Sequence, residues 1–142
     1  MLPTDRFVAE TVLWVRYAET DAMRIVHHSQ YLVYFEEARS EYMRQRGENY
    51  ARFEEDGFNL AVTEAHVRYA RPAVYGQQIR VRCWIAEVQS RGMRFGYQVT
   101  HADTGDVHAT GETRHICVKR DGGVALIPPR WRDWASASTA PE

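Results

Sequence analysis

The chain of 142 residues is long enough for one domain with a buried core, and its 44% hydrophobic content is ordinary for a globular protein. Its 18 basic and 19 acidic residues give a net charge of -1, without the basic excess of a nucleic-acid-binding protein. No apolar run approaches the ~18 residues of a membrane-spanning helix, and MLPTDRF lacks the basic and apolar segments of a signal peptide. We therefore expect a cytoplasmic protein that binds neither nucleic acid nor membrane.

The first part of the chain predicts a strand followed by a long helix. Residues 7–19 are rich in Val, Trp, Leu and Tyr and contain no breaker, which is typical of a strand that ends near Thr20 and Asp21. From His28 to Arg46 apolar residues recur every three or four positions, which indicates one amphipathic helix that stops at Gly47. The predicted buried face of this helix consists of Tyr31, Tyr34, Phe35, Ala38, Tyr42 and Met43.

The rest of the chain predicts four strands joined by short antiparallel turns. A polar segment at 47–57 is interpreted as a loop or short helical turn, and strands follow at 58–70, 78–88, about 93–99 and 107–120. In residues 78–88, Ile79, Val81, Cys83 and Ile85 alternate with polar residues, which indicates one buried face. The two cysteines, Cys83 and Cys117, have no metal-site or disulfide-framework spacing and are expected in the core.

The end of the chain is expected to be irregular. RDGG at 120–123 predicts a hairpin turn, which VALI and a break at Pro128 and Pro129 follow. A single helix with a large apolar face has to bury it against the one available sheet. We therefore predict an α+β fold with a five-stranded antiparallel sheet wrapped around one long helix, residues 1–134 in a single domain and 135–142 as a disordered tail.

The stretch from Val15 to Arg39 carries the most informative pattern: Tyr17, then Thr20-Asp21, then His28 at the predicted helix start, then Tyr31 and the segment FEEAR at 35–39. In this pattern the chain resembles the 4-hydroxybenzoyl-CoA thioesterase family and its YbgC-like acyl-CoA thioesterase branch. Tyr69 with Pro72 and the run ATGETR at 109–114 are also similar to the family.

The resemblance implies a hot-dog fold and an acyl-CoA thioesterase that needs no cofactor or metal. It also implies a homo-oligomer, for which we predict a tetramer built from dimers with each active site at a protomer boundary. An exposed edge at residues 58–70 would favour pairing with a second copy. Two departures from the family pattern are Met23-Arg24, in place of a loop glycine, and Gln30, in place of Asn, and the first leaves the path of this loop open.

Thioester hydrolysis gives these residues roles. The unpaired amides of a helix N-terminus can stabilise the oxyanion that forms at the thioester carbonyl, which points to the amide of His28 or its neighbour. Asp21 could attack the carbonyl directly or deprotonate a water, and the family carries its essential carboxylate at this position. We assign Asp21 and His28 as catalytic residues. Substrate-binding candidates are Tyr17, Thr20, Tyr31, Arg68 and Arg91.

Each assignment has a structural alternative. An Asp just before a helix is most often a cap or turn residue, and His28 could serve only as a structural hydrogen-bond partner. Asp21, His27 and His28 could be proposed as metal ligands, but their spacing matches no standard ligand set. The arginines could bind CoA phosphates, although arginines on strand faces are more often simply solvated.

Three functions follow from these alternatives. The first is acyl-CoA hydrolysis, for which acyl carrier protein is the other possible carrier. The sequence leaves open which acyl group is bound and whether Asp21 acts as nucleophile or base. The second is a non-catalytic protein that binds acyl thioesters, which the Met23-Arg24 departure favours. The third, a hydratase, ranks last because no Asn-Pro-like turn follows Asp21.

Overall fold

The computed structural model describes residues 2–135, without the side chains of Tyr50 and Ala135. Its elements in chain order are β1 (Ala9–Trp14), the 3-10 turn η1 (Tyr17–Glu19), α1 (Gln30–Gln45), α2 (Tyr50–Glu55), β2 (Phe58–Tyr69), β3 (Gln78–Val88), β4 (Gly92–His101), β5 (Val107–Lys119), α3 (Pro129–Arg132) and η2 (Asp133–Ala135).

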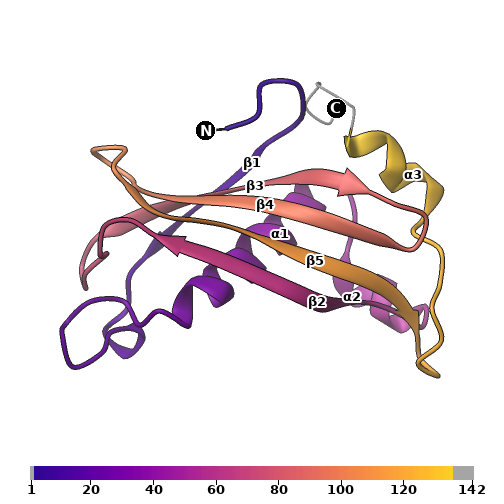
Figure 1. Ribbon diagram of the computed structural model, residues 1–142, viewed down its shortest axis with the longest axis horizontal. Helices are drawn as coiled ribbons and strands as arrows, with labels where there is room; N and C mark the ends of the chain where they lie inside the picture. The colour runs from indigo at the N-terminus through magenta and orange to yellow at the C-terminus, as the bar shows by residue number, and fades with distance from the viewer. Residues whose placement is uncertain (1, 136–142) are drawn as a thin grey trace.

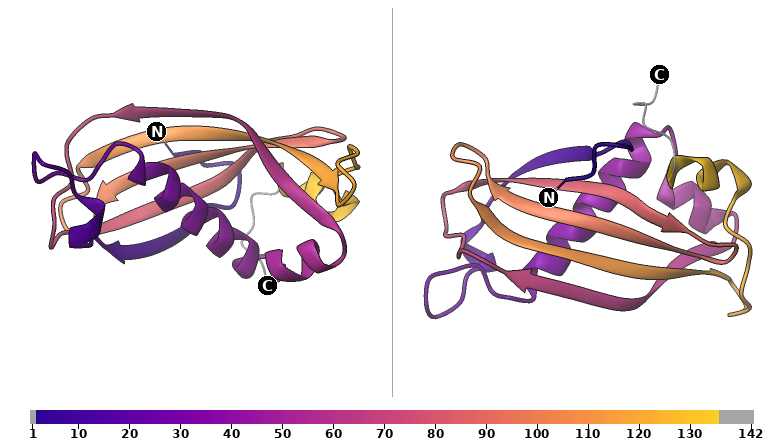
Figure 2. Two further views of the ribbon diagram at one scale, coloured as in Figure 1. Left: turned by 90° about the horizontal axis from the view of Figure 1, so that it is seen from below. Right: turned by 45° about the horizontal axis from the view of Figure 1, so that its top comes forward.

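The five strands form one antiparallel sheet in the order β1-β3-β4-β5-β2 (Figure 1). Helix α1 runs across one face of the sheet, which curves around it (Figure 2). The predicted α+β class and the arrangement of five strands around one long helix are confirmed. Strands β1 and β2 are the two edges, and β2 is twice as long as β1, with 12 residues against 6.

The core lies between α1 and the sheet. All six residues of the predicted helix face are buried, and they pack against buried side chains of β3 and β4. Phe35 stacks on Tyr97 with 4.2 Å between ring centroids. Gly111 on β5 permits this approach, because a Cβ atom there would lie 2.6 Å from the Phe35 ring. Cys83 and Cys117 are free and buried, as predicted.

Two predicted boundaries are wrong in the same region. The first strand ends at Trp14 rather than at residue 19, because Tyr17–Glu19 form a 3-10 turn in which the Glu19 amide donates to the Arg16 carbonyl at 3.0 Å. The long helix begins at Gln30 rather than at His28, with Ser29 as its N-cap. The segment around Asp21 is therefore a longer connection than the sequence predicts.

Short helices flank the far end of the sheet. The segment at 47–57 contains α2, whose N-cap Asn49 accepts hydrogen bonds from the amides of Ala51 and Arg52. Pro129 starts α3 at a place where the sequence predicts only a break. The predicted tail lies outside the described residues, except for Ala135 at the end of η2. Within residues 2–135, no helix has the length and apolar character needed to cross a membrane.

Candidate active site

The loop after η1 folds back on itself with Asp21 at its start. The Asp21 amide donates to the Ile25 carbonyl at 2.9 Å, and the Arg24 amide donates to the Asp21 carbonyl at 2.9 Å. The Asp21 carboxylate accepts a hydrogen bond from the Met23 amide at 2.8 Å through Oδ1. Ile25 forms a bridge with Val74, which ties the loop to the segment before β3. These bonds fix the direction of the Asp21 side chain.

Arg24 explains how this loop closes without glycine. Its φ is 67°, and in the part of the chain that the structure describes it is the only residue other than glycine with positive φ. Glycine adopts this left-handed conformation readily, whereas a residue with a Cβ atom adopts it at an energetic cost. The loop therefore has Arg24 where a glycine is usual in the family, but its backbone keeps a conformation that glycine would also adopt.

Glu19 anchors the base of the loop to α1. Its side chain is buried and accepts hydrogen bonds from the Arg16 amide at 2.8 Å and the Tyr34 hydroxyl at 2.9 Å. The His27 amide donates to the Glu19 carbonyl at 2.8 Å. Burial, followed by the hydrogen bond to Glu19, raises the pKa of Tyr34 far above its usual range, so this hydroxyl remains a donor. The position of Asp21 relative to the helix thus depends on Glu19.

The amides at the start of α1 are only partly paired. The Gln30 amide donates to the His27 carbonyl at 2.9 Å, and the Ser29 amide donates to Nδ1 of His27 at 3.2 Å. No acceptor among the described residues binds the amide of His28. The His28 carbonyl accepts a hydrogen bond from the Tyr69 hydroxyl at 3.0 Å, and the His28 ring stacks on that of His27. His28 therefore precedes the helix, with its backbone held and its N–H unpaired.

Asp21 and His28 line the same cavity, which has a volume of about 200 Å³. Tyr31 of α1 lines it as well, so three of the predicted site residues lie together. Burial raises the pKa of the Tyr31 hydroxyl. The remaining lining residues come from the loop, from the end of β2 and from β5: Met23, Ile25, Val26, Tyr69, Ala70, Arg71, Pro72 and His108.

Asp21 also lines a second hollow. It has a volume of about 660 Å³ and is lined by Tyr17 and Thr20, the other two candidates from the motif, together with Tyr75. The exposed rings of Tyr17 and Tyr75 meet edge to face at 5.7 Å. Asp21 therefore lines both a smaller cavity and a larger hollow.

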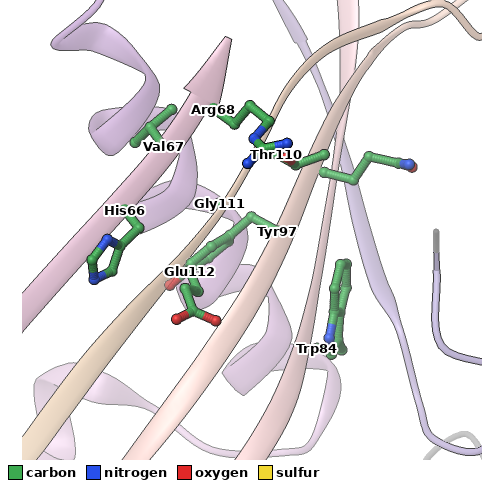
Figure 3. A pocket seen from close by; sticks show the side chains of 9 residues that line it. His66, Val67, Arg68, Trp84, Tyr97, Thr110, Gly111 and Glu112 are labelled. Atoms are coloured by element: carbon green, nitrogen blue, oxygen red, sulfur yellow. The ribbon is translucent and has the colours of Figure 1, made fainter. Parts of the chain in front are cut away.

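The two arginine candidates lie elsewhere within the chain. Arg68 lines a hollow on the sheet face opposite α1, beside Thr110 and across from Trp84 (Figure 3). Arg91 lines a third hollow at the turn between β3 and β4. Neither hollow includes Asp21, so one copy of the chain does not bring these arginines to the acid. Within residues 2–135, no group of three or more His, Cys, Asp or Glu side chains could hold a metal ion.

Residues 15–135 match the family model of the thioesterase-like superfamily. The chain belongs to this superfamily. Its predicted class, a thioester hydrolase, is confirmed at the level of the family, and the resemblance noted in the sequence is confirmed with it.

Individual relatives agree. The Bacillus subtilis protein named "Putative acyl-CoA thioesterase YneP" is 32% identical over 134 residues, which cover 92% of this chain and 94% of that protein. The crystal structure of hypothetical protein TT1821 from Thermus thermophilus has a TM-score of 0.83 at 38% identity and covers 90% of this chain and 97% of its own. DHNA-CoA thioesterase from Staphylococcus aureus has a TM-score of 0.82 at 30% identity, and the match covers 91% of this chain and 89% of that protein's chain. The predicted hot-dog fold is thereby confirmed.

The structural roles of three residues in this region carry no signal in the sequence. Glu19 lies in a segment that predicts a strand, and its burial depends on partners in α1. Tyr69 and His108 come from β2 and β5, which are far from the motif in sequence, and only the antiparallel pairing of these strands brings them to the cavity. Tyr69 could be noted from the family resemblance, but its bond to the His28 carbonyl could not.

Proposed function

We propose that the protein hydrolyses acyl-CoA to the free acid and CoA, with Asp21 and the backbone amide of His28 as its catalytic groups. The observation that carries this proposal is that Asp21 and His28 line one cavity and that the His28 amide has no acceptor among the described residues. The names of the Bacillus subtilis and Staphylococcus aureus relatives support CoA as the carrier. Acyl carrier protein is the other carrier compatible with this chemistry.

In the proposed reaction the His28 N–H donates to the thioester carbonyl oxygen, where negative charge develops. Proximity to the N-terminus of α1 adds the favourable field of the helix dipole. The Met23 amide binds Oδ1 of Asp21, which leaves Oδ2 to act on the substrate. As a nucleophile, Oδ2 forms an anhydride with the acyl group, the CoA thiolate leaves, and water then hydrolyses the anhydride. As a base, Oδ2 takes a proton from the attacking water, and the tetrahedral intermediate expels the same thiolate.

The substrate contacts follow from the two spaces beside Asp21. We assign the acyl group to the small cavity that Tyr31 lines, and the start of the CoA arm to the larger hollow that Tyr17 and Thr20 line. Arg68 and Arg91 could bind CoA phosphates only across a subunit boundary, because each lies away from Asp21 in its own chain.

The long edge strand supports an oligomer. Strand β2 pairs with β5 on one side only, and Val62 near its middle is 52% exposed. Antiparallel pairing of β2 with its copy would remove this open edge, and we propose such a dimer as the unit of a tetramer. Sedimentation equilibrium at micromolar concentration is expected to give a dimer or tetramer. A monomer would contradict the proposal.

The variant Asp21→Asn tests the catalytic assignment. It keeps an oxygen that can accept from the Met23 amide but cannot act as nucleophile or base, so we expect kcat to fall about 10³-fold or more with unchanged unfolding and sedimentation. Thiol release from short aliphatic, long aliphatic and benzoyl-type CoA thioesters is the measurement. Asp103→Asn, in an exposed turn, is the matched control and should retain wild-type turnover.

Two results would count against the proposal. Unchanged turnover in Asp21→Asn would discard the assignment of Asp21. Absence of thiol release by the wild-type protein from every thioester, combined with measurable binding of the same compounds, would instead identify a non-catalytic binding protein.

A further inference from the structure

Arg24 brings an unpaired positive charge to the larger hollow of the candidate site. The residue is exposed, and its guanidinium makes no hydrogen bond or ion pair with the described part of the chain. Two other arginines nearby have partners. Arg16, before the loop, binds Glu19 at 3.0 Å, and Arg71, beside the smaller cavity, binds Asp106 at 3.2 Å. Of these three cations, Arg24 is the one that is free to bind an anion from outside the chain.

The backbone holds this charge close to Asp21. Because the Arg24 amide donates to the Asp21 carbonyl at 2.9 Å, the turn keeps the two Cα atoms within about 7 Å of each other. The φ of 67° is costly for arginine and would be free of this cost for glycine. Backbone strain of this kind is concentrated at ligand sites, where a contact of the side chain offsets it. The strained position and the unpaired charge therefore indicate a ligand for the guanidinium.

The rest of the hollow offers apolar contacts. Tyr17 and Tyr75 are 77% and 62% exposed, and their rings meet edge to face at 5.7 Å. Exposed aromatic rings bind apolar groups, whereas arginine binds phosphate through parallel N–H bonds. A pantetheine arm that ends in a phosphate carries both kinds of group, since two methyl groups lie next to the phosphate. The volume of about 660 Å³ leaves room for the arm to bend toward Arg24.

We propose that Arg24 binds the phosphate at the end of the pantetheine arm and thereby determines specificity for the carrier of the acyl group. This inference rests on the proposed function, in which the arm enters this hollow. CoA and acyl carrier protein both have a phosphate at this place, as a diphosphate and as a phosphodiester. The contact is particular to this chain, because Arg24 stands where the family pattern has a glycine.

A series of carriers with one common acyl group tests the inference without any mutation. Thioesters of phosphopantetheine and of pantetheine differ only in the phosphate. We expect kcat/KM of the wild-type protein to favour the phosphopantetheine thioester about 10-fold or more, because a hydrogen bond to a charged group contributes more than a neutral one. A ratio near 1 would overturn the inference.

Three variants then assign the preference to the guanidinium. Glycine adopts positive φ without strain and asparagine tolerates it, so Arg24→Gly and Arg24→Asn are both expected to fold. Each should bring the ratio close to 1 by lowering kcat/KM for the phosphorylated substrate, with the pantetheine thioester within about 3-fold of wild type. Arg24→Lys keeps the charge without the planar pair of donors and should keep part of the preference. A wild-type ratio in Arg24→Gly would overturn the inference.

A matched control separates a contact from the overall field of the protein. Arg44→Gln also removes one positive charge, at a side chain on α1 that is 54% exposed, and should keep the wild-type ratio. Added salt should lower the ratio of the wild-type protein and leave that of Arg24→Gly nearly constant, because salt screens an exposed ion pair. A loss in Arg44→Gln equal to that in Arg24→Gly would overturn the inference.

The same variants identify the carrier. A loss in Arg24→Gly with the CoA thioester alone assigns the contact to CoA, and a loss with the acyl carrier protein thioester alone assigns it to that protein. Losses with both carriers assign it to the phosphate that they share. No loss with either carrier would overturn the inference.

The two proposals fail in different ways. An equal loss for the pantetheine thioester in Arg24→Gly would indicate a contact with the amides of the arm and overturn the inference, while hydrolysis itself would stand. Failure of the wild-type protein to hydrolyse any thioester would reject the proposed function instead. Calorimetric binding of CoA would then still test Arg24, since Kd should rise about 10-fold in Arg24→Gly. An unchanged Kd would overturn the inference.

Discussion

The two ends of α1 differ in how their free backbone groups are satisfied. At the N-terminal end, Ser29 makes no side-chain capping bond and the amide of His28 has no acceptor among the described residues. At the C-terminal end, the Arg46 amide donates to the carbonyls of Tyr42 and Met43 at 3.1 Å, and the Glu48 amide donates to the Met43 carbonyl at 2.8 Å. The helix is thus closed at one end and open at the other.

Side chains strengthen the closed end. The Arg46 guanidinium lies over the rings of Phe7 and Trp134, at 4.6 and 5.2 Å from their centroids. Glu48 accepts hydrogen bonds from Arg130 and from the Trp131 indole. The hydrogen bond from the Arg130 guanidinium holds the pKa of Glu48 below its usual range, and the weaker bond from the Trp131 indole acts in the same direction. The chain after β5 therefore binds back onto the end of the helix.

The comparison indicates a division of roles along one element. Helix ends normally find capping partners, because unpaired amides and carbonyls are unfavourable when they are removed from water. The closed end follows this rule and contributes stability. The open end departs from it at a cavity that Asp21 and His28 both line, and an unpaired amide at such a cavity could stabilise a developing oxyanion.

Removal of Trp131 is expected to give the largest effect on stability at the closed end. Its ring is 1% exposed, stacks on Trp134 and lies 5.0 Å from Phe53. Trp131→Ala should lower the free energy of unfolding by about 3–5 kcal/mol, because it creates a large cavity and removes the hydrogen bond from the indole to Glu48. Urea denaturation measures the loss. At temperatures where the variant is folded, kcat should stay near that of the wild type.

Trp131→Phe separates packing from hydrogen bonding. It keeps an aromatic ring but cannot donate to Glu48, so we expect a smaller loss of about 1–2 kcal/mol. The division between the two ends would be wrong if Trp131→Ala cost less than about 1 kcal/mol. It would also be wrong if the folded variant lost turnover as severely as Asp21→Asn.

Much of the fold could be predicted because the spacing of apolar residues within a strand or helix is a local property of the sequence. The alternation in β3 and the spacing of the helix face identify their buried residues correctly. The end of β1 could not be predicted, because the strand-forming composition continues to Tyr17 and the turn depends on Glu19 binding to Tyr34. Helix α3 was missed because Pro129 was interpreted as a break, although proline is common at the first position of a helix.

The candidate site divides in the same way. Asp21, His28 and Tyr31 belong to one short segment, so a loop and a helix start were enough to place them together. His108 could not be predicted, since strand alternation gives no sign of the β-bulge between β4 and β5 at which it lies. Arg68 and Arg91 were chosen for their charge, and charge alone does not determine which face of the sheet a side chain occupies.

Arg24 gives the smallest expected effect and tests whether the open end also retains backbone strain. Because its φ is 67°, Arg24→Gly should relieve the contact between Cβ and the backbone, at a partly offsetting cost in the entropy of the unfolded chain. We expect a net gain of about 0.5–1 kcal/mol in the free energy of unfolding. Ala22 lies in the same loop without a positive φ, so Ala22→Gly relieves no strain. This variant should lower the free energy of unfolding by about 0.5–1 kcal/mol. Equal destabilisation of both variants in urea would contradict strain at Arg24.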